Sequence, residues 1–318
     1  NDTASPSPGN GPDQYNGAGL SAAANALPAP ASFIPRVRWV DSATEAPASS
    51  LAPAFGYFHG GEPGYTKTRV DRIDFSNDTD TLTARGPLST GRSWTGVASN
   101  KDYGYWAGGY DVNIWPRNMS SVDRIDYSND SATTSPKGPI SLARYFLGGT
   151  GNASYGYFGG GYGPSTDVSN VDRIDYSNDT PTASPKGALD YAPAGIQKQG
   201  VTGNQSFGYF ASGDSYVTKV TRIDYSNDTA TSTPKGPITT ARQSIAATGN
   251  ASFGYFAGGT NPSTPNNTTY VDRIDYSNDT ATGPAVGSLS LGQNSAGATG
   301  SPAFGYVGGG DTGGESNI

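Results

Sequence analysis

The stretch VDRIDYSNDT occupies residues 171–180 and recurs unchanged at residues 271–280. Near copies stand at residues 70–79, 122–131 and 220–229. A second phrase, FGYF or a close variant, begins at six positions, Phe55, Tyr103, Tyr155, Phe207, Phe253 and Phe304, and these starts lie 46 to 52 residues apart. A period near this length is typical of proteins in which one small unit is stacked or arranged in a ring. The sequence therefore predicts a single repeated structural unit.

Each repeat is expected to fold into four short strands. In the copy at residues 253–256, alternate residues of FGYF fall on opposite faces, as they do in a β-strand. The next strand is expected at 271–276, and the Ser-Asn-Asp at 277–279 favours a turn, because these side chains bond to nearby backbone. A third strand at 280–282 runs into a Pro-Lys-Gly-Pro corner in several copies, and a fourth, such as 244–248, leads to the next FGYF. No helical period persists, so the chain is predicted to be all-β.

Composition supports a folded, turn-rich protein and excludes some classes of function. Hydrophobic residues make up 34% of the chain, with 45 glycines and 23 prolines, which lies within the globular range. The net charge of −7 argues against a nucleic-acid-binding protein, which would carry a basic surface. No apolar run is long enough to insert into a membrane. The chain has no cysteine, so no disulfide can stabilise it.

The layout of the repeat resembles that of kelch repeats. It consists of a strand that ends in Gly-Gly, a variable loop, a strand of the form V-x-x-Y/I-D, a turn, and a P-x-x-R segment. The resemblance covers residues 55–310 and implies a β-propeller in which each repeat forms one four-stranded blade. The wording FGYFGGG…VDRIDYSNDTAT…PKGP is also similar to that of repeat proteins encoded by marine bacteriophages. The outer-strand Trp that is usual in kelch repeats is absent here.

The number of repeats predicts how the ring closes. There are six FGYF strands but five VDRID strands, and residues 36–41 of the N-terminal region echo the VDRID pattern. We therefore expect an all-β, six-bladed kelch-like propeller, with five or seven blades as the alternatives. It should be closed by pairing of residues 36–41 with the strand at 304–307, which removes open sheet edges. Val37 precedes Phe55 by 18 residues, whereas the internal spacing is mostly 33, so this blade should be shortened.

Two segments of different character divide the chain. Residues 1–32 are rich in Pro, Ala, Gly and Ser and show no strand pattern, so they are expected to form an extended arm that contacts other subunits of an assembly. Residues 33–318 are expected to form the propeller.

The VDRID phrase is interpreted mainly as a structural element. Its Arg and second Asp lie on one strand face, and both faces of a blade meet neighbouring blades, so these charges are expected to pair within or between blades. The structural residues are Arg72, Asp74, Arg124, Asp126, Arg173, Asp175, Arg222, Asp224, Arg273 and Asp275. The alternative is a cation site formed by Asp74, Ser76, Asn77, Asp78 and their equivalents, since calcium loops collect such oxygens. The spacing of an EF-hand is absent, so no metal or other cofactor is expected.

The loops between FGYF and the next VDRID are the variable part of the repeat, with lengths of 11, 15, 12, 9 and 14 residues. In a propeller these loops emerge on one face, and their aromatic and short polar side chains suit contact with a sugar or a protein. The candidate binding residues are Tyr65, Tyr110, Trp115, Arg117, Tyr162, Tyr216, Asn266 and Tyr270, and the same loops carry Asp167, Lys219 and Asn267.

Catalysis finds little support in the sequence, because His59 is the single histidine and no nucleophile–base pair recurs. We expect a non-enzymatic structural or binding protein, most simply a fibre, appendage or surface decoration of a bacteriophage virion that binds host-surface glycan or protein. Its location would be the virion surface or the extracellular space. The alternatives are a secreted bacterial adhesin or extracellular matrix protein, and a polysaccharide-cleaving propeller with carboxylates in its central funnel. The fold alone does not decide among them.

Overall fold

The computed structural model describes residues 36–38 (backbone only), 55–59, 67–191, 195–263 and 267–312. Its strands are β1 Arg36–Arg38, β2 Phe55–His59, β3 Val70–Asp74, β4 Thr83–Arg85, β5 Gly96–Ser99, β6 Tyr103–Ala107, β7 Val122–Asp126, β8 Ser135–Lys137, β9 Gly148–Gly151, β10 Tyr155–Gly159, β11 Val171–Asp175, β12 Ser184–Lys186, β13 Gly200–Gly203, β14 Phe207–Ala211, β15 Val220–Asp224, β16 Thr233–Lys235, β17 Ala246–Gly249, β18 Phe253–Ala257, β19 Tyr270–Asp275, β20 Ala285–Ser288, β21 Gly297–Gly300 and β22 Phe304–Gly308. Two single-turn 3₁₀ helices, Tyr127–Asn129 and Tyr225–Asn227, occupy Ser-Asn turns.

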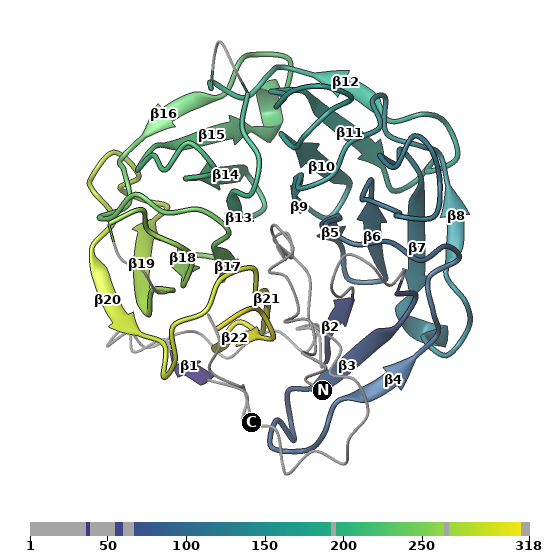
Figure 1. The fold of residues 1–318 in the computed structure, drawn as a ribbon, viewed down its shortest axis with the longest axis horizontal. Helices are drawn as coiled ribbons and strands as arrows, with labels where there is room; N and C mark the ends of the chain where they lie inside the picture. The colour runs from purple at the N-terminus through teal and green to yellow at the C-terminus, as the bar shows by residue number, and fades with distance from the viewer. Residues whose placement is uncertain (1–35, 39–54, 60–66, 192–194, 264–266, 313–318) are drawn as a thin grey trace, which may run out of the picture.

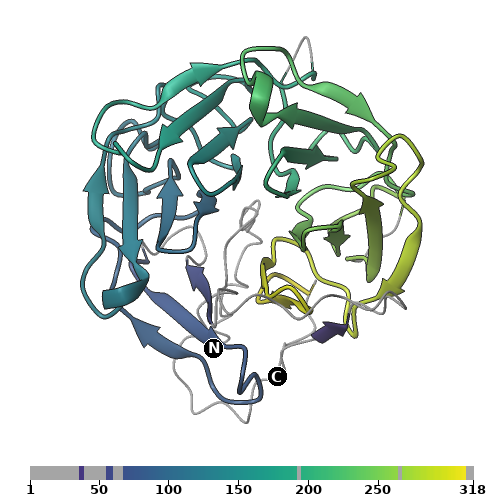
Figure 2. The same cartoon turned by 180° about the vertical axis from the view of Figure 1, so that it is seen from behind.

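The strands form antiparallel sheets arranged around a common centre (Figures 1 and 2). Four sheets have four strands each: β5–β8, β9–β12, β13–β16 and β17–β20. Two further sheets have three, β2-β3-β4 and β1-β22-β21. The fold is thus an all-β propeller with four-stranded blades. The structure does not show the six complete four-stranded blades that were predicted. Within the described residues, the β2-β3-β4 sheet lacks an inner strand and the β1-β22-β21 sheet lacks an outer one.

The chain runs outward from the centre in each complete blade, as Figure 1 shows for β13 to β16. The FGYF phrase forms the second strand and VDRID, or VTRID, the third. In the β14–β15 pair, Phe207 lies opposite Asp224 and Tyr209 opposite Arg222. The same register recurs in the other blades, so each FGYF tyrosine faces the arginine of the following strand.

The outer strands differ from the sequence prediction. The expected Pro-Lys-Gly-Pro corner is partly strand, since β8 includes Pro136 opposite Asp123. Proline suits an outer edge because it cannot donate to a further strand, and it protects the edge from unwanted pairing. The outer strand β20 contains no proline. There the register shifts from Val271–Gly287 to Asp272–Ala285, so the exposed Val286 is the extra residue of a β-bulge, a second way to protect an edge.

Ring closure occurs where it was expected, over a shorter stretch. Strand β1 pairs antiparallel with β22, with Arg36 opposite Tyr306, as Arg222 lies opposite Tyr209 elsewhere (Figure 1). The remainder of the predicted segment 36–41 and the arm 1–32 lie outside the described residues. Tyr306 also reaches the first blade, where its hydroxyl donates to Asp78 at 2.8 Å and its ring stacks on Phe75. The first and last blades are therefore in direct contact.

The hydrophobic core lies between neighbouring blades. Phe158, from one FGYF strand, packs in one buried cluster with Tyr105 of the preceding blade. Tyrosines from adjacent blades stack in pairs, such as Tyr105 on Tyr176 and Tyr157 on Tyr225, with ring centroids 4.8 and 4.6 Å apart. Each stack contributes about 0.5–1.5 kcal/mol beyond the area it buries. The two faces of a blade are both buried, which explains why FGYF has large side chains on the adjacent third and fourth residues, such as Tyr157 and Phe158, which point to opposite faces.

The glycine of each Pro-Lys-Gly segment allows blades to approach closely. Gly138 donates its backbone N–H to the carbonyl of Asp179 in the next blade at 2.9 Å. A Cβ atom at this position would collide with the carbonyl group of Pro181. Any larger residue would therefore push the two blades apart.

Candidate functional site

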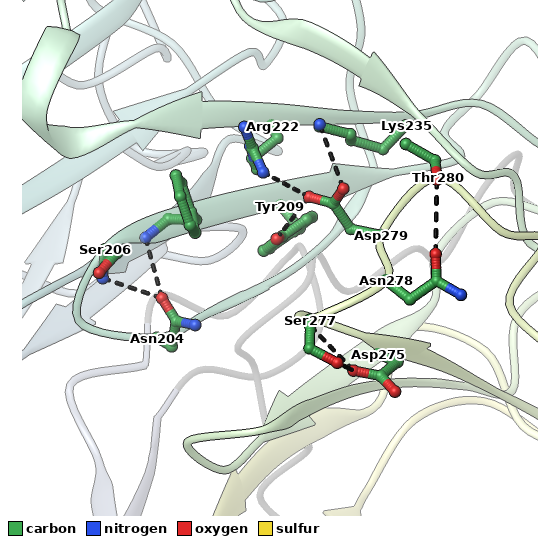
Figure 3. Close-up of polar contacts among 11 residues, drawn as sticks. Asn204, Ser206, Tyr209, Arg222, Lys235, Asp275, Ser277, Asn278, Asp279 and Thr280 are labelled. Carbon is green, nitrogen blue, oxygen red and sulfur yellow. Dashed lines mark hydrogen bonds and ion pairs between the residues drawn. The ribbon is translucent and has the colours of Figure 1, made fainter.

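The first candidate is a polar cluster at the blade interfaces, which we call the turn cluster because its centre is the Asp of a Ser-Asn-Asp turn. In Figure 3, the carboxylate of Asp279 accepts hydrogen bonds from the Tyr209 hydroxyl at 2.9 Å and from Arg222 at 2.6 Å. Lys235 pairs with its other oxygen at 3.1 Å. The three donors come from one blade and the acceptor from the next. The turn cluster therefore fastens adjacent blades to each other.

The same arrangement recurs around the ring. The equivalent sets are Asp130 with Tyr57, Arg72 and Arg85; Asp179 with Tyr105, Arg124 and Lys137; and Asp228 with Tyr157, Arg173 and Lys186. In these sets and around Asp279 the central Asp is buried, with 6 to 8% of its surface exposed. A buried carboxylate is stable only when charged and polar partners surround it. Because the protein itself supplies all of them, the turn cluster is a structural device.

The arginine partners differ from the expected ones. The prediction paired the VDRID arginines with the second Asp of the phrase, such as Arg173 with Asp175, within or between blades. Arg173 instead bonds Asp228 of the next blade at 2.6 Å. Asp175 accepts from the backbone N–H and the hydroxyl of Ser177, and these hydrogen bonds, the hydroxyl first, lower the pKa of Asp175 below its usual value. The two carboxylates of the repeat thus have separate tasks, one in fixing the turn and one in joining blades.

The serine at the second turn position acts in the same way in the other copies. It donates to Asp74, Asp126, Asp224 and Asp275, which include the oxygens assigned to the alternative cation site. Among the described residues, no group of three or more His, Cys, Asp or Glu side chains is placed to hold a metal ion.

A second ion pair lies inside individual blades. Arg144 and Asp172 have no exposed side-chain surface and bond at 2.8 Å. Arg92–Asp123 and Arg242–Asp272 are the equivalent pairs. In the β13–β16 blade, Ile196 and Thr221 stand at these two positions, and both are buried. Both members of the pair are therefore replaced together, which avoids leaving one buried charge unpaired.

The second candidate lies at the end of the ring where the inner strands begin. One residue just before each inner strand joins a chain of backbone hydrogen bonds that passes from blade to blade. Phe146 donates to the Trp94 carbonyl, Lys198 to Phe146, Ser244 to Lys198, and Ser295 to Ser244, at 2.8 to 3.2 Å. We call these five residues the axial ring. Because the inner strands lie around the centre in Figures 1 and 2, the axial ring follows the inner edge of five of the sheets at the end where those strands begin.

The axial ring has a left-handed backbone at every member. The φ angles of Trp94, Phe146, Lys198, Ser244 and Ser295 lie between 55° and 59°. Non-glycine residues adopt this region at a cost of about 1–3 kcal/mol, and such positions gather at ligand sites. The blade-to-blade hydrogen bonds hold this backbone in place, and all five positions carry a side chain where glycine would be easier.

Next to the axial ring, loop residues form short bridges that differ in chemistry from blade to blade. In the β9–β12 blade, Tyr145 bridges to Tyr162, and Tyr162 to Asp167. In the β5–β8 blade, Ser93 bridges to Tyr110, and in the β17–β20 blade the pair is Gln243 and Thr260. We define the mouth as the axial ring together with Tyr110, Tyr145, Tyr162, Asp167, Gln197, Asp214 and Gln243.

One half of the mouth is aromatic. Trp94 lies 4.4 Å from Phe146 and 5.4 Å from Tyr145, measured between ring centroids, and Tyr145 lies 5.4 Å from Tyr162. Tyr110 also contacts Trp94 and Tyr145. At the equivalent positions of the later blades the side chains are short and polar or charged. The backbone is repeated, but the mouth has an aromatic side, where Trp94 and Phe146 are buried and Tyr145 and Tyr162 half-buried, beside a polar one.

The polar half contains a pair of carboxyl groups. Asp167 stands on the loop after β10 and Asp214 on the loop after β14, in the adjacent blade. Burial, followed by the influence of the Asp214 carboxyl group, raises the pKa of Asp167 to about 7, while Lys198 opposes the shift. Gln197 fixes Asp214 by donating to its carboxylate at 3.2 Å, and the backbone N–H of Asp214 donates to the Gln197 carbonyl.

The residues predicted from the variable loops divide into three groups. Tyr110 and Tyr162 belong to the mouth, and Tyr216 accepts a hydrogen bond from Gln243 of the mouth. Trp115 is 88% exposed, and on the same loop Arg117 donates to the Tyr110 hydroxyl at 2.9 Å. Tyr270 is 41% exposed at the start of β19. Tyr65 and Asn266 lie outside the described residues.

Sequence reasoning missed the axial ring. Trp94, Phe146 and Lys198 lie just before the inner strand, in a stretch that was treated as part of the regular repeat. An alignment of the copies on the inner-strand glycine would have revealed the changing residue type. The left-handed backbone at these positions has no signal in the sequence, because none of the five is glycine or asparagine.

His59 is a buried residue at the end of β2 and 1% exposed. It packs edge-on against Trp106 of the next blade, and burial lowers its pKa to about 3. Alanine or glycine stands at the equivalent end of the other FGYF strands. The neutral ring thus fills space between blades.

Comparison with known proteins places the fold. No protein-family model and no curated protein sequence matches the chain. In the described residues, no helix has the length and apolar character needed to cross a membrane. Among solved structures, the fold is similar to that of YjhT, with a TM-score of 0.63 over 86% of this chain and 89% of YjhT. Only 12% of the aligned residues are identical, so the similarity concerns the propeller fold alone.

Proposed function

We propose that the protein is a non-enzymatic binding protein whose mouth holds a carbohydrate. The observation that carries this proposal is the division of the mouth, where an aromatic side and a polar side occupy equivalent positions of one repeated backbone. Blade packing requires no such difference, since the turn cluster joins the same blades with nearly the same side chains, Arg85 replacing the lysine of the other sets. A ligand that has both an apolar face and polar edges would explain why the mouth is divided into an aromatic and a polar side.

A sugar ring has that character. Its C–H face packs on aromatic rings, and its hydroxyls need donors and acceptors at the edge. In the mouth, Tyr145 and Tyr162 are half-buried rings, and the half-buried Asp214 and Gln197 offer carboxyl and amide groups. The exposed Trp115 stands on the loop that leaves Tyr110, so it extends the aromatic side outward.

The setting proposed for this binding is the surface of a bacteriophage virion, in a fibre, appendage or decoration protein that attaches to host glycan. The support is the wording of the repeats and the acidic, cysteine-free composition. The fold proposed for it is a kelch-like ring of six blades, in which the two three-stranded sheets count as blades. Several copies in one assembly would turn weak single contacts into firm attachment. A secreted adhesin would use the same mouth.

Substitution of the exposed Trp115 and the half-buried Tyr162 tests the proposal. Trp115→Ala with Tyr162→Ala should leave the melting temperature nearly unchanged and weaken adsorption to a glycan array at least about tenfold, since an aromatic anchor contributes more than about 1.4 kcal/mol. The matched control is Asn227→Ala, which changes an exposed turn at the opposite end of β15. The proposal fails if the double variant binds like the parent while the control loses binding.

A further inference from the structure

The outer strand β20 differs from the other outer strands in the residues along its free edge. In β8, β12 and β16 a proline lies opposite the second residue of VDRID or VTRID, and a lysine lies opposite the initial valine. In β20 the residues at these two positions are Ala285 and Gly287, with Val286 between them. Strand β4 keeps a charge, Arg85, at the lysine position. Of the outer strands that the structure describes, β20 alone therefore has neither a proline nor a charged residue.

This edge, which we call the β20 edge and define as Ala285–Ser288 with Tyr270, is exposed and partly apolar. Strand β20 lies at the outer rim of the ring (Figure 1), and all four of its residues are exposed. Val286 is 43% exposed, and Tyr270, which pairs with Ser288, is 41% exposed. An outer strand with unpaired N–H and C=O groups and no protecting side chain is a template for a further strand.

The backbone of the β20 edge limits the kind of strand that can pair with it. Leu289 donates to the Thr269 carbonyl at 2.7 Å, so its N–H points into the sheet. Because successive residues of a strand alternate in direction, the N–H and C=O groups of Ser288 point outward. The bulge at Val286 interrupts the regular ladder, so the straight part of the edge is short. The bulge thus protects the edge from long strands and leaves it open to a short one, such as a second β20.

Charge also favours a second copy of this chain as the partner. The net charge is −7, so two copies repel each other overall. No charged residue occurs between Asp279 and Asp311, a stretch that contains β20 and the two strands after it. Strands that meet through this stretch carry no like charges. A twofold axis gives both copies the same partner, so the pairing closes at two copies and does not extend into a fibre.

We propose that the β20 edge is a dimer interface, at which two copies pair antiparallel through β20 about a twofold axis. The two β17–β20 blades then form one continuous sheet, and Val286 and Tyr270 of each copy lie against the other copy. Because the paired stretch is short, the dimer is weak and dissociates on dilution. It brings two mouths into one particle, and it does not depend on what the mouth binds.

Self-association of the full chain tests the proposal. Sedimentation velocity at increasing protein concentration should show the parent change from monomer to dimer. Val286→Lys places two like charges at the interface and should raise the dissociation constant at least about tenfold. The matched control is Ser135→Lys, which adds the same charge to the exposed edge of β8 and should leave the constant unchanged. Melting temperatures equal to that of the parent would show that both variants are folded. A parent that stays monomeric at every concentration, or Val286→Lys that dimerises like the parent, overturns the proposal.

Cross-linking locates the contact. The chain has no cysteine, so a single introduced cysteine reports on one position. A Cβ atom at Gly287 would meet no other atom within 4 Å, so Gly287→Cys fits the fold, and Ser288→Cys lies exposed beside it. Under mild oxidation at least one of these variants should form a covalent dimer, since a disulfide needs Cα atoms within about 7 Å of each other. Ser184→Cys, on the exposed edge of β12, should remain monomeric. Cross-linking of Ser184→Cys to the same extent, or of neither β20 variant, would mean that the copies do not meet at β20.

Discussion

The turn cluster and the mouth are built on the same repeated backbone, yet their side chains follow opposite rules. In the turn cluster, five interfaces bring a tyrosine to the Asp of the next turn, as Tyr157 to Asp228 and Tyr306 to Asp78. In the mouth, equivalent positions hold Trp94, Lys198 and other unlike residues. The difference shows where repetition is needed, because a turn-cluster side chain must match a partner from the next copy.

The side chains of the axial ring do not supply the hydrogen bonds that join its members. Their blade-to-blade hydrogen bonds use backbone atoms alone, which every residue type except proline supplies. Residue type is therefore free to change from blade to blade without loss of the ring. A repeat protein can in this way keep a symmetric frame and carry an asymmetric site.

The buried pair of Arg144 and Asp172 provides the sharpest test of this rule, since it is fixed in three blades and exchanged in a fourth. Arg144→Ile alone should lower the free energy of unfolding by about 3–5 kcal/mol, because it leaves Asp172 buried and unpaired. Adding Asp172→Thr copies the residues Ile196 and Thr221 and should restore stability to within about 1 kcal/mol of the parent. Denaturant unfolding of the single and double variants measures both values.

If the double variant is as unstable as the single one, the exchange in the β13–β16 blade depends on its surroundings and the two positions are not a unit. The variant Asp172→Thr alone completes the cycle and isolates the coupling between the two residues.

A smaller loss is expected in the turn cluster. Asp228→Ala leaves Arg173, Lys186 and the Tyr157 hydroxyl without their acceptor and should lower the free energy of unfolding by about 2–4 kcal/mol. The exposed Asp175 is the matched control, since its removal costs a turn hydrogen bond of about 1 kcal/mol. Equal losses for Asp228→Ala and Asp175→Ala would contradict the assignment of separate tasks to the two carboxylates.

The sequence predicted those parts of the fold that depend on repeated local chemistry. The period, the FGYF and VDRID strands and the Ser-Asn-Asp turns were all visible, and the N-terminal strand was expected beside β22. It did not reveal which Asp meets Arg173, because two aspartates of one repeat look alike until the next blade is placed beside them. It also misplaced the inner strand, expected at 244–248 and found at Ala246–Gly249.

The candidate site was predicted only in part, for a physical reason. Tyr110 and Tyr162 follow the Gly-Gly pair, in the loops whose length varies between repeats, and this variation identified them as candidate binding residues. Trp94 and Lys198 sit in a strained backbone that only the contact between blades stabilises.

The smallest effect tests whether the closing interface equals the internal ones. Tyr306→Phe removes the hydrogen bond from the last blade to Asp78 in the first, and Tyr157→Phe removes the equivalent bond between two complete blades. Each should lower the free energy of unfolding by about 1 kcal/mol, the net contribution of one hydrogen bond, because the rings remain stacked. Denaturant unfolding of the two variants under the same conditions compares the interfaces directly. A loss for Tyr157→Phe with none for Tyr306→Phe would mean that Asp78 is satisfied by other groups at the closing interface, so that the ring is held shut chiefly by strand β1 and by the stack of Tyr306 on Phe75.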